Sequence, residues 1–365
     1  MPVAIRINRG LNEPWRKLWP AGGLESVELC PVCGHDKRSL LYRDLVDDTF
    51  RAAPGSWSLW QCSLCHSAYL NPRPTRDAIH LAYANYYTHK QPEPKADYAA
   101  LRPIFKVRRR LLNGYTNWRY GTGSSPSSKW GILAALALPG ARKIPDLEFR
   151  HLPKLYGGGG RLLDVGCGDG TFLRQAQSCG WDVVGLDTDT AVVASAVQQG
   201  LAVFKGGIEY FAEGSDMFDV ITLNHVIEHL HDPVQDLSKC YTLLKPGGQL
   251  WIETPNVESS GHALFQRHWR GLEVPRHLVL FNQRSLRKLL SSIGFQQLKE
   301  LPRYNQSRDI YASSYAISQG IPLCQAGVMP FRLRLLASLT KIADFFPGAR
   351  HEFLTLSGQK PKNLS

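Results

Sequence analysis

A run of nine residues near the middle of the chain constrains its fold more than any other feature. Leu162-Leu163-Asp164-Val165 is apolar apart from one acid, and glycines follow at alternate positions, Gly166, Gly168 and Gly170. This pattern predicts a buried parallel strand that ends in a tight turn and leads into a helix over 172–179, because glycine lets a backbone turn sharply and approach a ligand closely. A second apolar run ends in Asp187, where a carboxylate can accept both ribose hydroxyls of a nucleoside cofactor.

The charges of this turn narrow the class of cofactor. Its G-x-G-x-G spacing is shorter than the G-x-G-x-x-G of dinucleotide sites, and it contains two acids, Asp164 and Asp169, and no basic residue. A pyrophosphate would meet like charges there, whereas a cationic amino-acid tail would be attracted. The turn therefore favours a nucleoside cofactor that carries positive charge.

The turn resembles the first motif of the class I methyltransferases that use S-adenosylmethionine. Phe218–Asn224, His225–Leu230 and Leu243–Gly248 are similar to the later motifs of that class in order and spacing. The segment Trp269–Leu278 is similar to sequences of one bacterial branch of that class. Members of this branch modify small molecules and glycan precursors and are related to the ubiquinone-biosynthesis O-methyltransferases. The resemblance covers about 140 residues. It implies an α/β, doubly wound, Rossmann-like fold with a seven-stranded sheet, mostly parallel, whose last strand is antiparallel.

Hydrophobic periodicity gives the expected positions of the elements of this core. Strands are expected near 161–165, 182–187, 201–204, 218–223 and 249–254, a helix over about 283–293, and a final edge strand over 353–357. Upstream, helices are expected near 100–112 and 130–138.

The resemblance also implies a set of cofactor-binding residues. The methionine end of the cofactor would lie against Asp164, Gly166, Gly168 and Gly170, and the ribose against Asp187 and Thr188. Gly207 and Ile208 would neighbour the adenine, and Asn224 and His225 would flank the methyl group.

Methyl transfer from sulfonium is an in-line displacement, and a hydroxyl acceptor must also lose a proton, for which histidine is a natural base. His225 and His229 lie four residues apart, so on a helix they would share one face. We expect His229 to be the base, with His225 nearer the cofactor and His277 a further candidate. In the alternative, Glu228 and His229 only orient the loop through hydrogen bonds.

Four of the eight cysteines have the spacing of metal ligands. Cys30 and Cys33 form one C-x-x-C pair and Cys62 and Cys65 another, with 28 residues between them, which predicts a structural Zn²⁺ site. The unit is similar to the zinc heads of sugar and polysaccharide-pathway methyltransferases. That resemblance implies a cap over the acceptor pocket, which nearby tyrosines (Tyr83, Tyr86, Tyr87) could line; in the alternative they only pack.

The positive charge is uneven. The net charge is +12, and residues 100–155 contain 11 Lys and Arg against 2 Asp and Glu. The positive charge of this segment suggests that it binds an anionic membrane surface, a phosphorylated substrate or nucleic acid. In the alternative, the segment is only a solvated helical insertion. A mixture of aliphatic and basic residues over 331–346 could likewise lie on a membrane or pack internally.

The longest uninterrupted apolar run, Ile132–Leu138, is far shorter than the roughly 20 residues that span a bilayer. No signal peptide is recognised, which predicts a cytoplasmic protein, with peripheral attachment to a membrane as the alternative.

These features predict six consecutive segments: an N-terminal arm (1–24), a four-cysteine zinc unit (25–90), a basic helical linker (91–155), a methyltransferase core (156–305), a helical insertion (306–350) and a final edge strand with tail (351–365). The predicted function is methyl transfer to a small molecule or sugar precursor. Two alternatives stay open. One is a zinc-containing rRNA methyltransferase that modifies guanine, and the other is a non-catalytic scaffold that retains the fold.

Overall fold

A seven-stranded sheet forms the centre of the larger part of the chain in the structure, a computed structural model that describes residues 15, 17–83, 102–156, 159–343 and 349–362. The predictions for residues 1–14 of the arm, for Tyr86 and Tyr87, and for 344–346 lie outside these described residues. The chain divides into two compact units, one of residues 87–256, 283–306 and 353–365 and the other of residues 1–86, 257–282 and 307–352. Each unit combines segments that the predicted linear division separates, and each is described by itself.

The sheet confirms the predicted fold class. Its strands lie in the order β12 (Gln296–Glu300), β13 (Phe353–Gln359), β10 (Leu244–Pro255), β9 (Phe218–Asn224), β6 (Arg161–Val165), β7 (Asp182–Asp187) and β8 (Val203–Lys205). The pairs from β10 to β8 are parallel, and β13 is antiparallel to both of its neighbours. The expected edge position of the last strand is wrong, because β13 lies between β10 and β12 and β12 forms the edge.

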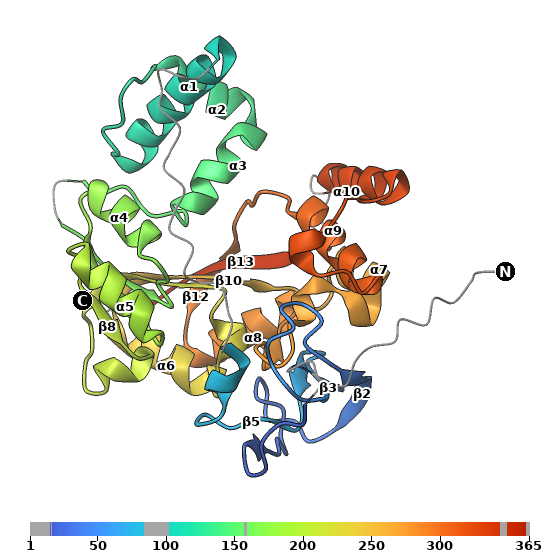
Figure 1. The fold of residues 1–365 in the computed structure, drawn as a ribbon. Coiled ribbons are helices and arrows are strands. Elements are labelled where there is room, and N and C mark those ends of the chain that lie inside the picture. The colour runs from blue at the N-terminus through green and yellow to red at the C-terminus, as the bar shows by residue number, and fades with distance from the viewer. Residues whose placement is uncertain (1–14, 16, 84–101, 157–158, 344–348, 363–365) are drawn as a thin grey trace. The chain divides into compact units, whose positions relative to one another are not determined.

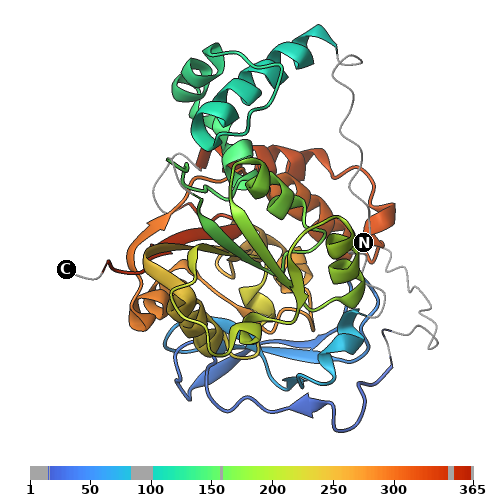
Figure 2. The ribbon, with the colours of Figure 1, turned by 90° about the vertical axis from the view of Figure 1, so that its left-hand side faces the viewer.

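Helices connect the parallel strands. These are α4 (Thr171–Ser178), α5 (Thr190–Gln198), α6 (Pro233–Leu243) and α8 (Gln283–Ile293). The strand order reverses at the β6–β9 pair, so right-handed crossovers put helices on both faces of the sheet (Figure 1, Figure 2). The Asp189 carboxylate accepts from the Ala191 backbone N–H (2.8 Å) and fixes the start of α5. The carboxyl ends of β6, β7 and β9 therefore meet at the switch point where such sheets bind ligands.

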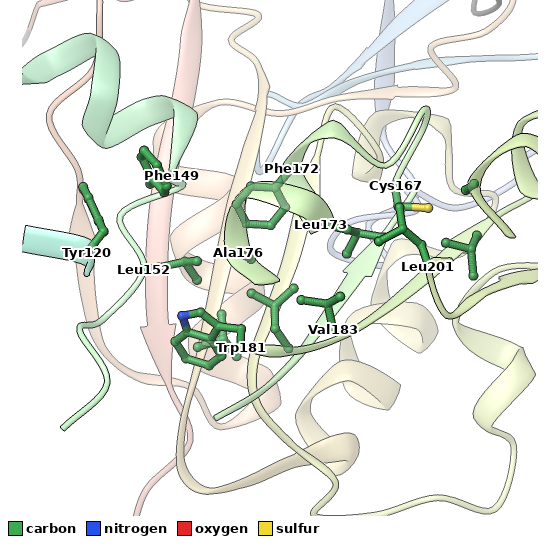
Figure 3. Packing of buried hydrophobic residues seen from close by; sticks show 14 of the residues in the cluster. Tyr120, Phe149, Leu152, Cys167, Phe172, Leu173, Ala176, Trp181, Val183 and Leu201 are labelled. Atoms are coloured by element: carbon green, nitrogen blue, oxygen red, sulfur yellow. The ribbon is translucent and has the colours of Figure 1, made fainter. Parts of the chain in front are cut away.

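The core beneath this switch point is aliphatic and aromatic. Leu173 and Ala176 of α4 pack with Trp181 and Val183 at the start of β7 (Figure 3). All four side chains are at most 5% exposed. Burying a side chain of this size contributes about 1.5–3 kcal/mol, which holds β6 and its following turn rigidly against α4.

A helical insertion precedes β6 in the same unit, with α1 (Pro103–Tyr120), α2 (Trp130–Ala137) and α3 (Pro139–Glu148). Glycines permit close contact between α1 and the start of α2, since a Cβ on Gly131 would lie only 1.9 Å from the Leu111 carbonyl oxygen. The Tyr115 and Tyr120 hydroxyls both donate to buried Asp146 of α3 (2.7 and 2.6 Å). The insertion is therefore a packed helical group.

The other unit contains a four-stranded sheet in the order β11 (Val279–Leu280), β4 (Ala68–Leu70), β3 (Trp57–Cys62) and β2 (Arg38–Leu45), and a small pair, β1 (Leu24–Glu25) with β5 (Arg73–Pro74). Its helices are α7 (Ser260–Phe265), α9 (Ser307–Ser318) and α10 (Phe331–Ala343). β11, which directly follows the Trp269–Leu278 segment, pairs with β4 of the cysteine-bearing sheet. Among the described residues, no helix has the length and apolar character needed to cross a membrane.

Candidate functional site

The glycine turn after β6 adopts a backbone that other residues rarely take. Gly166, Gly168 and Gly170 all have positive φ, of 68°, 54° and 73°. A Cβ on Gly166 would lie 2.5 Å from Val226, and one on Gly170 would lie 2.4 Å from Leu201 Cδ1. Both crowding and backbone conformation therefore require glycine, as predicted for a turn that brings its backbone close to a ligand.

Asp187 lies at the carboxyl end of β7 and is hydrogen-bonded to this turn. Its Oδ2 accepts from the Gly168 backbone N–H (2.9 Å) and its Oδ1 from that of Asp189 (2.9 Å). Burial raises the pKa of the carboxyl, while the two backbone hydrogen bonds lower it. The next residue, Thr188, is exposed. The structure thus brings the glycine turn and Asp187 together, which the cofactor hypothesis requires.

Asp164 is more buried than a cation-binding acid in an open turn would be. Its side chain is fully buried, and one oxygen, Oδ1, accepts from Arg150 and from Thr222 Oγ1 (2.8 Å). The other oxygen, Oδ2, has no hydrogen-bond partner among the described residues. Burial raises the pKa of this carboxyl, against the opposing effects of the Arg150 charge and the Thr222 hydrogen bond. One acceptor oxygen of this buried carboxylate therefore has no protein partner among the described residues.

Arg150 is a member of the site that the sequence did not reveal. It follows α3 with φ of 47°, and its neighbour His151 has φ of 52°. Its Nη1 donates to Thr222 Oγ1 (2.9 Å), and its guanidinium carbon lies 3.8 Å from the Phe172 ring centroid. The turn itself lacks a basic residue, but the folded site contains one. Sequence reasoning missed Arg150, because this residue belongs to no motif and reaches the turn only through the fold.

His225 follows β9 and lies between two buried carboxylates. Its Nδ1 is 3.3 Å from Glu228 Oε1, and its Nε2 is 3.5 Å from Glu253 Oε1. Burial lowers the pKa of His225, but the hydrogen bonds and charges of Glu228 and Glu253 outweigh it and raise the pKa to about 9. At neutral pH the imidazole is therefore protonated and does not accept a further proton.

Glu253 is itself held by further partners. It accepts from Thr355 Oγ1 (2.7 Å) and from Arg303 Nη2 (3.3 Å). Burial raises its pKa, yet His225 and Arg303 more than compensate and bring the pKa down to about 2. The network fixes the His225 ring at the end of β9.

The expected helical relation of His225 and His229 is wrong. His225 has φ of 54°, and only a short 3-10 turn, η4 (Ile227–His229), follows it. Glu228 points into the core, where its Oε2 accepts from Thr254 Oγ1 (2.9 Å), and His229 is half-buried.

The predicted adenine and methyl neighbours lie at other strand ends. Gly207 precedes the short turn η3 (Ile208–Phe211), in which Ile208 is buried. The Gly207 N–H donates to Glu209 Oε1 (2.8 Å). Glu209 supplies an acid in this neighbourhood that the sequence reasoning did not single out. Asn224 is the last residue of β9 and pairs in register with Glu253.

His277 belongs to the unit that contains the cysteine sheet. Its side chain is buried, with Nδ1 2.8 Å from the Gly271 carbonyl oxygen and Nε2 3.8 Å from Glu273 Oε2. Next to it Arg276 forms a fully buried ion pair with Asp47 (2.6 Å). Within its own unit, His277 is part of a buried charged cluster.

The four predicted metal ligands come together in the same unit. The sulfur atoms of Cys30, Cys33, Cys62 and Cys65 all lie within 4.8 Å of one another, and the Cys30–Cys65 and Cys33–Cys62 pairs are 3.6 Å apart. Tetrahedral Zn²⁺ with Zn–S bonds of about 2.3 Å separates its sulfurs by roughly 3.8 Å. The arrangement and the thiolate donor set therefore fit Zn²⁺.

Comparison with known proteins agrees with this geometry. Residues 141–300 match a family model described as a methyltransferase domain. The ubiquinone biosynthesis O-methyltransferase of Pseudomonas aeruginosa is 34% identical over 105 residues, which cover 27% of this chain and 45% of that protein. The enzyme of the same name from Acinetobacter baumannii is 32% identical over 124 residues, 31% of this chain and 52% of that protein. The chain thus spans about half the length of these curated relatives.

Among solved structures, a SAM-dependent methyltransferase from Archaeoglobus fulgidus is similar with a TM-score of 0.40 and 18% identity, over 64% of this chain and all of that one. Phosphoethanolamine N-methyltransferase 2 of Haemonchus contortus, in complex with S-adenosyl-L-methionine, has a TM-score of 0.41 and 18% identity, over 68% and 59%. The region that matches the family model, residues 141–300, contains six of the seven strands of the sheet, so this part of the chain is similar to methyltransferase domains.

Proposed function

We propose that this protein transfers a methyl group from S-adenosylmethionine to a small molecule or a sugar or glycan precursor. The observation that carries the proposal is the glycine turn at the switch point of the sheet. Its Gly168 N–H donates to Asp187, and Asp164, which precedes the turn, has one oxygen without a protein partner among the described residues. The named relatives, all ubiquinone biosynthesis O-methyltransferases, support a small-molecule acceptor.

The residues of the turn suit the parts of this cofactor. Asp187 would accept the ribose hydroxyls and the free Oδ2 of Asp164 the ammonium group, while the Arg150 guanidinium has the charge that the cofactor's carboxylate needs. The bound cofactor supplies a methyl group on a positively charged sulfur. Gly166 and Gly168 allow a close approach of the ligand, since the backbone there lacks side chains.

Proton removal from a hydroxyl acceptor is assigned to His229. Glu228 and Glu253 keep the His225 imidazole protonated at neutral pH. Its role is therefore to place a fixed positive charge at the end of β9 and to donate hydrogen bonds. His229, which is half-buried in the turn η4 after β9, stays our candidate base, with His277 as the alternative. If neither accepts the proton, orientation of the acceptor alone would supply the rate.

A second candidate is an rRNA methyltransferase. The four-cysteine cluster followed by His66 and the basic helices favour it, because this combination resembles the guanine-modifying rRNA enzymes. A third candidate, a scaffold without catalysis, would bind the cofactor or nothing.

One labelling experiment separates the three. The purified protein is incubated with methyl-labelled S-adenosylmethionine in three separate reactions. One contains nucleotide sugars, one a lipid extract and one unmodified rRNA. Label in a sugar or lipid fraction supports the proposal, and label in rRNA alone replaces it with the second candidate. Absence of label in every fraction, together with no heat of S-adenosylmethionine binding by calorimetry and no thermal shift, favours the scaffold.

A further inference from the structure

Helix α2 is apolar on every side, yet only one side of it is buried. Gly131 and Ala135 form the packed face, whereas Trp130, Leu133 and Leu136 are 71%, 55% and 55% exposed. At 100° per residue the exposed side chains span one continuous arc opposite the packed face. An outer face of this kind indicates a binding surface, because a helix that is apolar all round is normally enclosed.

The packed face fixes which way α2 points. Gly131 lies against the backbone of Leu111 in α1, and Ala135 belongs to the buried cluster that also contains Tyr115 and Leu162. Because these contacts anchor the opposite side, the outer arc cannot turn inward without breaking them. We call Trp130, Leu133 and Leu136 the α2 outer face.

The helical insertion that contains α2 is positively charged. Residues 103–148 contain 8 Lys and Arg and 2 Asp and Glu. One of those acids, Asp146, is buried and accepts the hydroxyls of Tyr115 and Tyr120. On the surface, exposed Lys129 and Arg110 face solvent with Glu148 as the remaining acid. The insertion therefore presents apolar side chains together with an excess of positive charge.

Helix α10, in the other unit, has the same chemistry. Ala337 is buried, whereas Phe331, Leu335 and Leu339 are 74%, 51% and 49% exposed on the opposite side. Its sequence includes basic residues and no acid. Two separate helices thus pair an apolar outer face with positive charge.

We propose that α2, and independently α10 in the other unit, binds the surface of a bilayer that contains anionic phospholipids. Apolar side chains would enter the acyl boundary while Lys and Arg meet phosphate groups, which is how interfacial helices bind. A second copy of the chain would bring an equally positive surface against this one. The Leu-rich α2 outer face also differs from the hydrogen-bonding and stacking surfaces that bind nucleic acids. The proposal is independent of the methyl-transfer activity.

The test is vesicle flotation with the full-length protein. Vesicles of phosphatidylcholine alone are compared with vesicles that also contain phosphatidylglycerol, at about 0.1 M and about 1 M salt. We expect binding to the anionic vesicles at low salt and weaker binding in the other conditions. The double variant Trp130→Gln/Leu133→Gln should bind at least about tenfold more weakly, since two large apolar side chains no longer enter the lipid.

The matched control is Val197→Gln, which replaces a 51% exposed apolar residue on α5 and should bind as the unmodified protein does. Unchanged thermal unfolding of both variants verifies their folding. Failure of the unmodified protein to float, or equal binding by the α2 variant, overturns the proposal. It is also overturned if sedimentation shows a dimer that the α2 variant dissociates, or if the α2 variant loses RNA binding instead of vesicle binding.

Discussion

Arg150 determines the electrostatics of the cofactor turn although it lies outside every motif. Its ion pair with fully buried Asp164 neutralises a carboxylate that would otherwise be alone in the core. Breaking a buried pair by removing one partner is far more costly than breaking an exposed one, because the remaining charge has lost its solvation.

Replacement of Arg150 with Met is therefore expected to lower the free energy of unfolding by about 3–5 kcal/mol. The control, Lys245→Met, removes the half-exposed pair of Lys245 with Asp219 (2.8 Å) and should cost about 1 kcal/mol or less. Urea titrations measure both. Adding Asp164→Asn to Arg150→Met should recover part of the loss, and equal effects of the two single variants would refute the role of the buried pair.

The His225 network predicts a pH dependence of stability. The pKa of His225 is raised in the folded state from its ordinary 6.5 to about 9, so its protonation favours folding. The stabilisation is complete below about pH 6.5 and is lost as the pH rises through about 9. Unfolding of the unmodified protein and of His225→Gln is compared across this range, with exposed His80→Gln as control. The difference between unmodified protein and His225→Gln should shrink toward high pH; a difference that grows contradicts the network.

Among the secondary-structure elements, those with a strong local signal were predicted well. The strands β6 and β7 and the helix α8 have the expected bounds, because buried apolar runs and a glycine before Phe295 mark them. The errors arise where long-range contacts decide. Insertion of β13 between β10 and β12 depends on pairing along seven residues of β10, and the positive φ of His225 ends the expected helix before it begins.

The glycine turn offers a paired test at this level. Gly170→Ala places a Cβ 2.4 Å from Leu201 Cδ1 at φ of 73°, whereas Gly168→Ala, at φ of 54°, meets nothing within 4 Å. Gly168→Ala should therefore cost about 1–2 kcal/mol from backbone strain alone. Gly170→Ala should cost about 1–3 kcal/mol more from overpacking. Chemical unfolding gives both values, and indistinguishable losses would contradict the packing of the turn.

For the molecule as a whole, the sequence predicts the doubly wound sheet and the cysteine cluster but not how segments combine. The cysteine-bearing sheet gains β11 from residues 279–280, more than 200 positions downstream of β4. Spacing rules describe neighbours along the chain, and such distant pairing leaves no local pattern. Arg150 was missed for the same reason.

A metal measurement tests the organisation of the cysteine-bearing unit. We expect one Zn²⁺ per chain by elemental analysis and a lower unfolding temperature after chelation, since a structural Zn²⁺ stabilises the fold that binds it. Cys33→Ser should lose the metal, whereas Cys324→Ser, which removes an exposed cysteine outside the cluster, should retain it. Full zinc content in Cys33→Ser would refute the four-thiolate site.

The assignment of the cofactor is decided by the affinity of S-adenosylmethionine for variants of β7. Calorimetry is carried out on Asp187→Ala and on Asp182→Ala, whose exposed carboxylate lies at the opposite end of the same strand. Loss of charge-assisted hydrogen bonds to the ribose should raise the dissociation constant of Asp187→Ala by about 10- to 100-fold, with Asp182→Ala unchanged. An unaltered dissociation constant in a folded Asp187→Ala protein would contradict the account.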